Sequence, residues 1–254
     1  MICNLCIRFR KRRVYICRMN ELSYSLRALR ELFFPRMCPV CGKRLEVEEE
    51  FICPSCADDF PYTWSWAFEE NPVEQRMWER VGIVAGASLF FYRKESGYVE
   101  LVRKVKYGAD RALGLYLGRM LGERLRGSGR FDGVQAVVPV PLHPLRRWKR
   151  SYNQAEILAW GIAEGMGGLR VEPHLLRRNK YTRTQTKLSV EGRSTNVKNA
   201  FAMNPRVAAR LSSEGVGHIL VVDDVLTSGA TLSEAVAPLF PSFLVSVATA
   251  GFVE

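Results

Sequence analysis

Two adjacent aspartates followed by a hydroxyl-rich loop form the pattern in this sequence that could do the most chemistry. Asp223 and Asp224 follow the apolar run 219–222, and residues 227–231 read Thr-Ser-Gly-Ala-Thr. The apolar run predicts a strand buried on both faces of a parallel sheet, and such sheets present ligands at the C-terminal ends of their strands. Hydroxyls, backbone N–H groups and a glycine ahead of a helix suit a phosphate. The pattern therefore indicates a sugar phosphate bound with a divalent cation.

A second group with chemical potential is a set of four cysteines in two Cys-x-x-Cys pairs, namely Cys38, Cys41, Cys53 and Cys56. This spacing lets each turn direct two thiolates at one tetrahedral Zn²⁺. Four thiolates leave no open coordination position, so we expect a structural zinc that folds a short ribbon at 35–60. The alternative is two unrelated redox-active or buried pairs. The ribbon is net acidic, which argues against its being the primary DNA contact.

A basic loop follows a second predicted strand, 134–138, and would lie at the same sheet edge as the phosphate loop. Within 139–156 it carries four basic residues: Arg146, Arg147, Lys149 and Arg150. They could neutralise a departing pyrophosphate, on which negative charge grows as its bond to ribose breaks. They could also bind a nucleic-acid backbone, with Trp148 and Tyr152 as stacking platforms. The two interpretations are compatible.

In their order along the chain, these motifs resemble the ComF (late-competence, ComFC-type) family of phosphoribosyltransferase-like proteins with an N-terminal zinc ribbon. Beside the cysteine pairs, the matching segments are 139–143 (Pro-Val-Pro-Leu-His), 150–154 (Arg-Ser-Tyr-Asn-Gln) and 223–231. The last resembles the signature for phosphoribosyl pyrophosphate (PRPP) in type I phosphoribosyltransferases. Ser151 stands where the family motif has glycine. The resemblance covers residues 35–252.

The resemblance implies a Mg²⁺-dependent PRPP site, with Asp223 and Asp224 as the catalytic pair that holds the ribose hydroxyls. The residues expected to bind PRPP are Asp223, Asp224, Val225, Thr227, Ser228, Gly229, Ala230 and Thr231. The loop expected to bind pyrophosphate or DNA comprises His143, Arg146, Arg147, Lys149, Arg150, Asn153 and Gln154. A flexible loop that closes over the substrate would contribute Arg183, Thr184, Gln185, Arg193 and Asn196. An exposed basic loop without such a role is the alternative for this last segment.

The net positive charge is distributed unevenly along the chain. The 254 residues contain 37 Lys+Arg and 26 Asp+Glu, which gives a net charge of +11. Residues 139–198 contain 12 basic and 4 acidic side chains, and residues 1–18 contain six basic and none acidic. The basic excess of 139–198 therefore points to the loops beside the predicted PRPP site, where it could serve pyrophosphate, DNA or both. For 1–18 we expect a solvated tail rather than an arm for nucleic acid.

The functional hypothesis is a PRPP-binding protein that acts in DNA uptake during natural transformation. The alternatives are a single-stranded DNA-binding adaptor whose PRPP site does not turn over, and a nucleobase salvage phosphoribosyltransferase. Turnover and the acceptor stay open, although Thr227 stands where enzymes acting on 6-oxopurines have an aspartate, which disfavours purine salvage. The resemblance implies PRPP, single-stranded DNA and a competence helicase as partners. The sequence Val-Val-Asp-Asp at 221–224 also opens response-regulator receiver domains, in which the acidic pair begins the domain and the phosphoacceptor lies far downstream. Only 30 residues follow Asp224 here, which disfavours that alternative.

The elements that must position these residues predict an α/β protein. We expect a type I phosphoribosyltransferase fold, a mainly parallel sheet flanked by helices, over 81–254. We expect a basic tail and short helix at 1–34, where the apolar face beginning at Leu22 favours Met19 as the native start. Arginines interrupt the first apolar residues before a signal peptide can form, so a cytoplasmic protein is expected. Prolines break the uncharged run 235–253, which we interpret as helix end, turn and buried strand rather than a membrane span.

Overall fold

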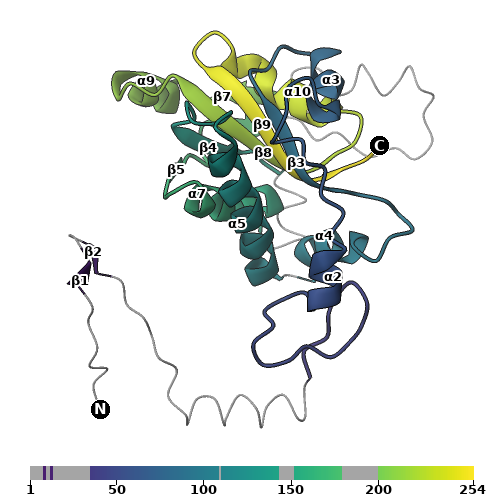
Figure 1. Cartoon of the computed structure of the whole chain (residues 1–254). Helices are drawn as coiled ribbons and strands as arrows, with labels where there is room; N and C mark the ends of the chain where they lie inside the picture. Colours follow the sequence, from purple (N-terminus) through teal and green to yellow (C-terminus); the bar gives the residue numbers. More distant parts are fainter. Residues whose placement is uncertain (1–7, 10–11, 14–34, 109, 143–151, 179–199) are drawn as a thin grey trace. The chain divides into compact units, whose positions relative to one another are not determined.

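The computed structural model describes residues 8–9, 12–13, 35–108, 110–142, 152–178 and 200–254. These residues fall into two compact units, Met1–Asp58 and Asp59–Glu254 (Figure 1). Most of the expected N-terminal tail and helix, the central part of the basic loop and the expected flexible loop lie outside the described residues.

The first unit contains two short strands, a cysteine-bearing turn and a short helix. Strands β1 (Arg8–Phe9) and β2 (Arg12–Arg13) pair antiparallel. Helix α2 (Pro54–Asp58) follows the turn. Gly42 has φ of +72°, a left-handed conformation that favours glycine, and it lets the chain reverse directly after Cys41. The sequence thus supplies the backbone freedom that a tight cysteine knuckle needs.

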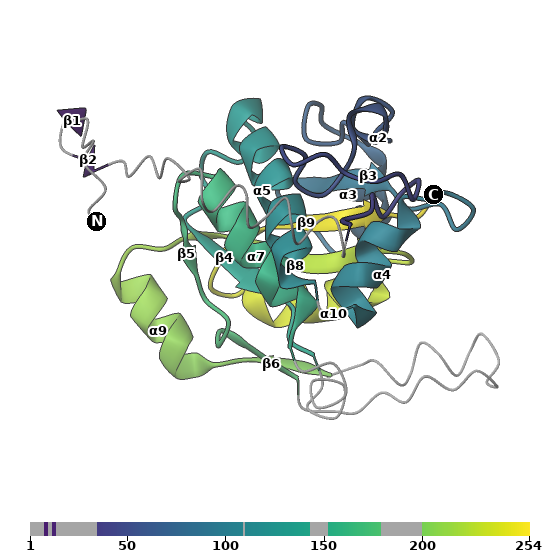
Figure 2. The ribbon, with the colours of Figure 1, turned by 90° about the horizontal axis from the view of Figure 1, so that it is seen from below.

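The second unit contains a five-stranded sheet, a two-stranded hairpin and helices on both sheet faces (Figures 1 and 2). The sheet strands are β3 (Gly86–Phe91), β4 (Ala136–Pro139), β5 (Arg170–Val171), β8 (His218–Leu226) and β9 (Leu244–Phe252). The hairpin strands are β6 (Leu176–Arg178) and β7 (Phe201–Met203). The helices are α3 (Pro72–Trp78), α4 (Val99–Tyr107), α5 (Arg111–Ser128), α7 (Gln154–Gly165), α9 (Pro205–Ser213), α10 (Ala230–Val236) and the 3₁₀ helix η1 (Ala237–Leu239).

The sheet has the order β3-β9-β8-β4-β5, and every pairing in it is parallel. This confirms the predicted α/β class with a mainly parallel sheet flanked by helices. The sequence-based boundary of β8 was too short, because the strand continues through Leu226 instead of ending before Asp223. Its partner β9 supplies the reason: Asp223 pairs with Thr249 and Val225 with Gly251, so the ladder extends past the apolar run.

Alternating side chains of the central strand pack against opposite layers. Ile219 and Val221 belong to a buried cluster that includes Leu232 and Val236 of α10. Leu220 and Val222 are also fully buried, and alternation directs them to the other face. Figure 2 shows α5 and α7 on one side of the sheet and α10 on the other. Both faces of β8 are therefore covered, and its C-terminal end is left as the place for a ligand.

The order of the strands reverses between β4 and β8. The chain leaves β4 through α7 and reaches the neighbouring strand β5, whereas it leaves β8 through α10 and reaches β9 on the opposite side. The connections that follow β4 and β8 therefore diverge at their C-terminal ends. Open α/β sheets bind ligands in the crevice that such a switch point creates.

The uncharged run 235–253 forms the end of α10, helix η1 and strand β9, as its prolines predicted. Within the part of the chain that the structure describes, no helix combines the length and apolar character needed to cross a membrane.

Candidate functional site

A cavity of about 370 Å³ opens at the switch point, a size typical of small-ligand sites. Its walls come from two segments, namely β8 with the loop and the first turn of α10 after it, and residues 140–142 after β4. Single residues from other elements complete the lining: Tyr92, Lys106, Arg178 and Thr249. Of the eight residues expected to bind PRPP, six line this cavity: Asp223, Asp224, Val225, Thr227, Gly229 and Thr231. Ser228 and Ala230 lie between them in the loop and at the start of α10.

The acidic pair forms the polar centre of the cavity. Asp223 Oδ1 accepts a hydrogen bond from the backbone N–H of Asp224 at 2.8 Å, and Asp224 Oδ1 lies 3.1 Å from Lys106 Nζ. Burial, and next the charge of Asp224, raise the pKa of Asp223 to about 7, although Lys106 and Arg178 act in the opposite direction. A substantial fraction of Asp223 thus holds a proton near neutral pH. A ligand that offers hydroxyls or a positive charge would favour its ionised form.

Arg76, a residue 151 positions before Thr227 in the sequence, holds the loop after β8. Gly229 has φ of +76° and precedes α10, which explains the need for glycine at this position. The Arg76 guanidinium of α3 donates to the carbonyl of Thr227, and also to the carbonyl of Val253 at 3.0 Å. The loop is therefore braced, while the side chains of Thr227 and Thr231 are exposed to the cavity. Hydroxyls and N–H groups on a braced loop suit an anionic group.

Asn153 and Gln154 are buried at the start of α7, where their side chains bond to other parts of the chain. Asn153 Nδ2 donates to the carbonyl of Val140 at 3.0 Å, and Gln154 Nε2 donates to the carbonyl of Lys106 at 3.4 Å. These bonds hold the base of the basic loop against β4 and α4. The remaining residues predicted for this loop, His143, Arg146, Arg147, Lys149 and Arg150, lie outside the described residues, as do Arg183, Thr184, Gln185, Arg193 and Asn196 of the expected flexible loop.

The interpretation of Tyr152 as a stacking platform is wrong. Its ring is buried, its hydroxyl donates to the carbonyl of Val105, and the Arg111 guanidinium lies 5.1 Å from the ring centroid. A face covered in this way is not available to a base. The tyrosine instead links the base of the loop to the last turn of α4.

The cavity residues that the sequence analysis did not assign to the site include Lys106, Arg178 and Tyr92. Lys106 ends a helix with ordinary amphipathic spacing, and Tyr92 directly follows β3, so neither has a local signature. Arg178 lies in a basic segment in which no single charge stands out. Only the fold brings these residues to the acidic pair. For Tyr92 one signal was available, because a residue that follows a parallel strand lies at the same edge of the sheet as the end of β8.

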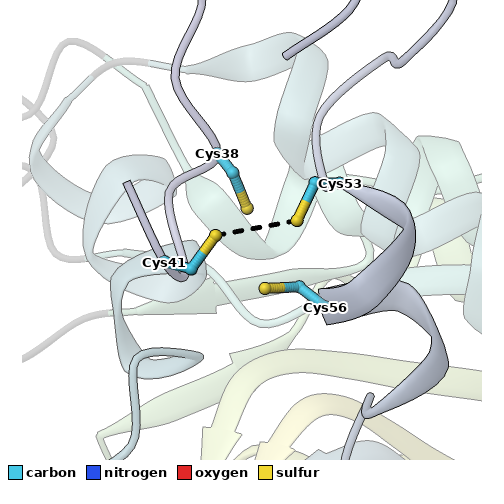
Figure 3. Close-up of side chains that lie close together, drawn as sticks. All are labelled: Cys38, Cys41, Cys53 and Cys56. Carbon is cyan, nitrogen blue, oxygen red and sulfur yellow. Dashed lines mark hydrogen bonds between the residues drawn. The ribbon is translucent and has the colours of Figure 1, made fainter. Parts of the chain in front are cut away.

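The four cysteines of the first unit converge on one point (Figure 3). Their sulfur atoms all lie within 4.8 Å of one another, and Cys41 Sγ is 3.6 Å from Cys53 Sγ. A tetrahedral zinc with bonds of about 2.3 Å separates its sulfur ligands by about 3.8 Å, so the spacing fits this ion. Burial raises the pKa of Cys56, whereas for Cys38 backbone hydrogen bonds outweigh burial and lower the pKa to about 7. The group could hold a metal such as zinc.

Comparison with known proteins finds relatives along most of the chain. The chain is 32% identical over 204 residues to the DNA utilization protein YhgH of Salmonella typhimurium, covering 78% of this chain and 81% of the relative. It is 27% identical over 206 residues to YhgH of Escherichia coli K12, with the same coverage. It is 27% identical over 221 residues to competence protein F of Haemophilus influenzae, covering 80% and 90% of the two chains. No family model matches the chain.

Proposed function

Because the chain belongs to the family of the DNA utilization protein YhgH, we propose that it is a PRPP-binding protein that acts in the uptake or use of DNA. The observation that carries the PRPP assignment is the cavity at the switch point. An acidic pair and a hydroxyl-bearing loop line the same space there, as a ribose phosphate requires. The names of the relatives support the DNA role, and they agree with the resemblance to the ComF family.

In the proposed complex, each part of PRPP meets a different segment. The 5′-phosphate binds the loop from Thr227 to Thr231, whose hydroxyls and N–H groups donate hydrogen bonds to its oxygens. Asp223 and Asp224 accept hydrogen bonds from the ribose hydroxyls. The pyrophosphate extends toward residues 140–142 and the basic loop that follows them. Mg²⁺, bound together with PRPP, would neutralise part of the pyrophosphate charge and stabilise it as a leaving group.

If transfer occurs, the chain's own residues contribute by position and charge. The braced loop fixes the phosphate, the acidic pair orients the ribose, and the carboxylates stabilise positive charge that develops at the ribosyl centre. The acceptor is open. The alternative is an adaptor that senses PRPP without consuming it while the basic loops bind single-stranded DNA, and a nucleobase salvage enzyme stays a further alternative.

We assign the four cysteines to a structural zinc. The sulfur spacing and the all-thiolate ligand set favour this ion, and they leave no position for a substrate. In so short a segment, the metal would supply the folding energy that a larger core would otherwise provide. A competence helicase and single-stranded DNA remain proposed partners.

Thermal unfolding with ligand tests the site. PRPP with Mg²⁺ should raise the unfolding temperature of the full-length, zinc-loaded protein, as any ligand of the native state does. The double variant Asp223→Asn/Asp224→Asn should fold and lose this response, whereas Asp132→Asn, a neutralised exposed carboxylate, should retain it. An unchanged response in the double variant would remove the acidic pair from the site.

A pyrophosphate-release assay then separates the enzyme from the adaptor. The protein is incubated with PRPP and Mg²⁺, with and without single-stranded DNA, and with a panel of nucleobases as acceptors. Pyrophosphate release that depends on DNA shows that DNA takes part in the reaction or activates it. Pyrophosphate release that depends on one nucleobase identifies a salvage enzyme. Binding without release under all conditions identifies the adaptor.

A further inference from the structure

Lys106 forms an ion pair with one member of the acidic pair in the cavity. Its Nζ lies 3.1 Å from Asp224 Oδ1, and the two side chains are only 20% and 19% exposed. At this depth the attraction between opposite charges is stronger than at an open surface. Among the described residues that line the cavity, the other basic side chain is that of Arg178. Lys106 is therefore a neighbour of the site, although no motif contains it.

The last turn of α4 is held in place by residues from outside this helix. The final carbonyls of a helix have no partner within it. Here the carbonyl of Val105 accepts from the Tyr152 hydroxyl, and the carbonyl of Lys106 accepts from Gln154 Nε2. The donors are the first and third residues after 143–151. The position of the ammonium group is thus tied to the base of the same loop that is proposed to meet the pyrophosphate.

The described residues that line the cavity give it no excess of negative charge. Two carboxyl groups face two basic side chains there, so a free divalent cation finds little net attraction. A polyphosphate ligand is different, because it brings several negative charges to which both basic residues can respond. Its bound metal also offers positive charge to the carboxylates. The cavity therefore discriminates between a metal ion alone and a metal ion that arrives with an anionic ligand.

We propose that Lys106 is the resident counter-ion of Asp224, that it excludes free divalent cations, and that it transfers to an anionic oxygen of PRPP when the metal–PRPP complex enters. The inference rests on the proposed function for its last step only. Metal and PRPP then bind as one unit. On binding, Asp224 loses its ion pair with Lys106 and gains hydrogen bonds from the ribose hydroxyls. Lys106 becomes a ligand-binding residue by this exchange.

The test uses Lys106→Gln in the full-length, zinc-loaded protein, with Lys104→Gln as the matched control. Lys104 lies on the same turn of α4 but is exposed, so its loss removes an equal charge away from the cavity. Binding of Mn²⁺ alone is followed by electron paramagnetic resonance, and binding of PRPP with Mg²⁺ is followed by calorimetry. Lys106→Arg keeps the charge and serves as a second control, and Lys106→Met, which also removes the charge, replaces the glutamine variant if that substitution prevents folding.

Lys106→Gln should bind Mn²⁺ alone at least tenfold more tightly than the wild type and PRPP with Mg²⁺ at least tenfold more weakly. Lys104→Gln and Lys106→Arg should resemble the wild type in both measurements. Unchanged Mn²⁺ binding in Lys106→Gln would refute the exclusion of free cations, and unchanged PRPP binding would refute the transfer. A wild type that binds no PRPP would refute the proposed function, while the Mn²⁺ measurement, which needs no PRPP, would still decide the exclusion step.

Discussion

Replacing Asp223 with asparagine should stabilise the folded protein and remove ligand binding at the same time. Asp223 belongs to strand β8 and is partly buried, and this burial together with the charge of Asp224 raises its pKa to about 7 from the ordinary 3.8. Its Oδ1 accepts a hydrogen bond from the N–H of Asp224, which an asparagine oxygen in the same place also accepts. The substitution therefore removes an unfavourable charge without removing a hydrogen bond.

The pH dependence follows from the direction of this shift. Since the pKa is higher in the folded than in the unfolded state, the folded state binds more protons between pH 4 and 7, and the wild type loses stability as the pH rises through that range. At about 1.4 kcal/mol per tenfold change, the full penalty above pH 7 is on the order of 4 kcal/mol, and about 2 kcal/mol of it is present at pH 5.5. Water in the open cavity reduces both figures, so they are upper bounds.

Thermal unfolding of the zinc-loaded protein at pH 5.5 and pH 8, without added divalent cations, measures the effect. For a unit of this size, 1 kcal/mol corresponds to about 2–4 °C. The variant should unfold at a higher temperature than the wild type at both pH values, and by up to about 4–8 °C more at pH 8 than at pH 5.5. Asp132→Asn should show no such pH-dependent gain. A variant that is less stable than the wild type at pH 8, or a stability gain that is equal at both pH values, would refute the raised pKa of Asp223.

Three further predictions test the supporting parts. Tyr152→Phe should cost about 1–2 kcal/mol in urea unfolding, because the buried carbonyl of Val105 loses its donor, and should weaken PRPP binding; an unaffected stability would deny the link between loop and helix. Cys41→Ser should lose the roughly one zinc per chain that elemental analysis is expected to find, whereas Cys17→Ser should retain it, and equal zinc in both would contradict the four-cysteine site. A variant in which the four loop cations are neutralised tests the DNA surface: Arg146, Arg147, Lys149 and Arg150. The slope of log affinity for single-stranded DNA against log salt concentration should become shallower by about 0.7 for each of these cations that contacts a phosphate. An unchanged slope would locate the DNA surface elsewhere.

The sequence predicted those features that depend on short segments. The apolar run before Asp223 indicated a buried parallel strand, and the two Cys-x-x-Cys pairs predicted a cysteine cluster, which the sulfur positions reproduce. In each case the residues that matter are neighbours in the chain, so spacing alone carries the information.

The features that the sequence did not predict depend on contacts between distant segments. Strand β8 extends past its apolar run because β9 pairs with it. Lys106 reaches Asp224 from a helix whose last turn accepts hydrogen bonds from Tyr152 and Gln154. The aromatic ring of Tyr152, in a basic segment, looked like a stacking surface until its burial was known. Tertiary packing decides such cases, and no local pattern reports it.

The most direct test of the account is calorimetric titration of PRPP into the full-length, zinc-loaded protein in the presence of Mg²⁺. The account predicts saturable binding of one PRPP per chain. Ribose 5-phosphate, which lacks the pyrophosphate, should bind more weakly, and the variant Asp223→Asn/Asp224→Asn should not bind PRPP. The absence of saturable binding by the folded wild-type protein, or equal binding by the double variant, would contradict it.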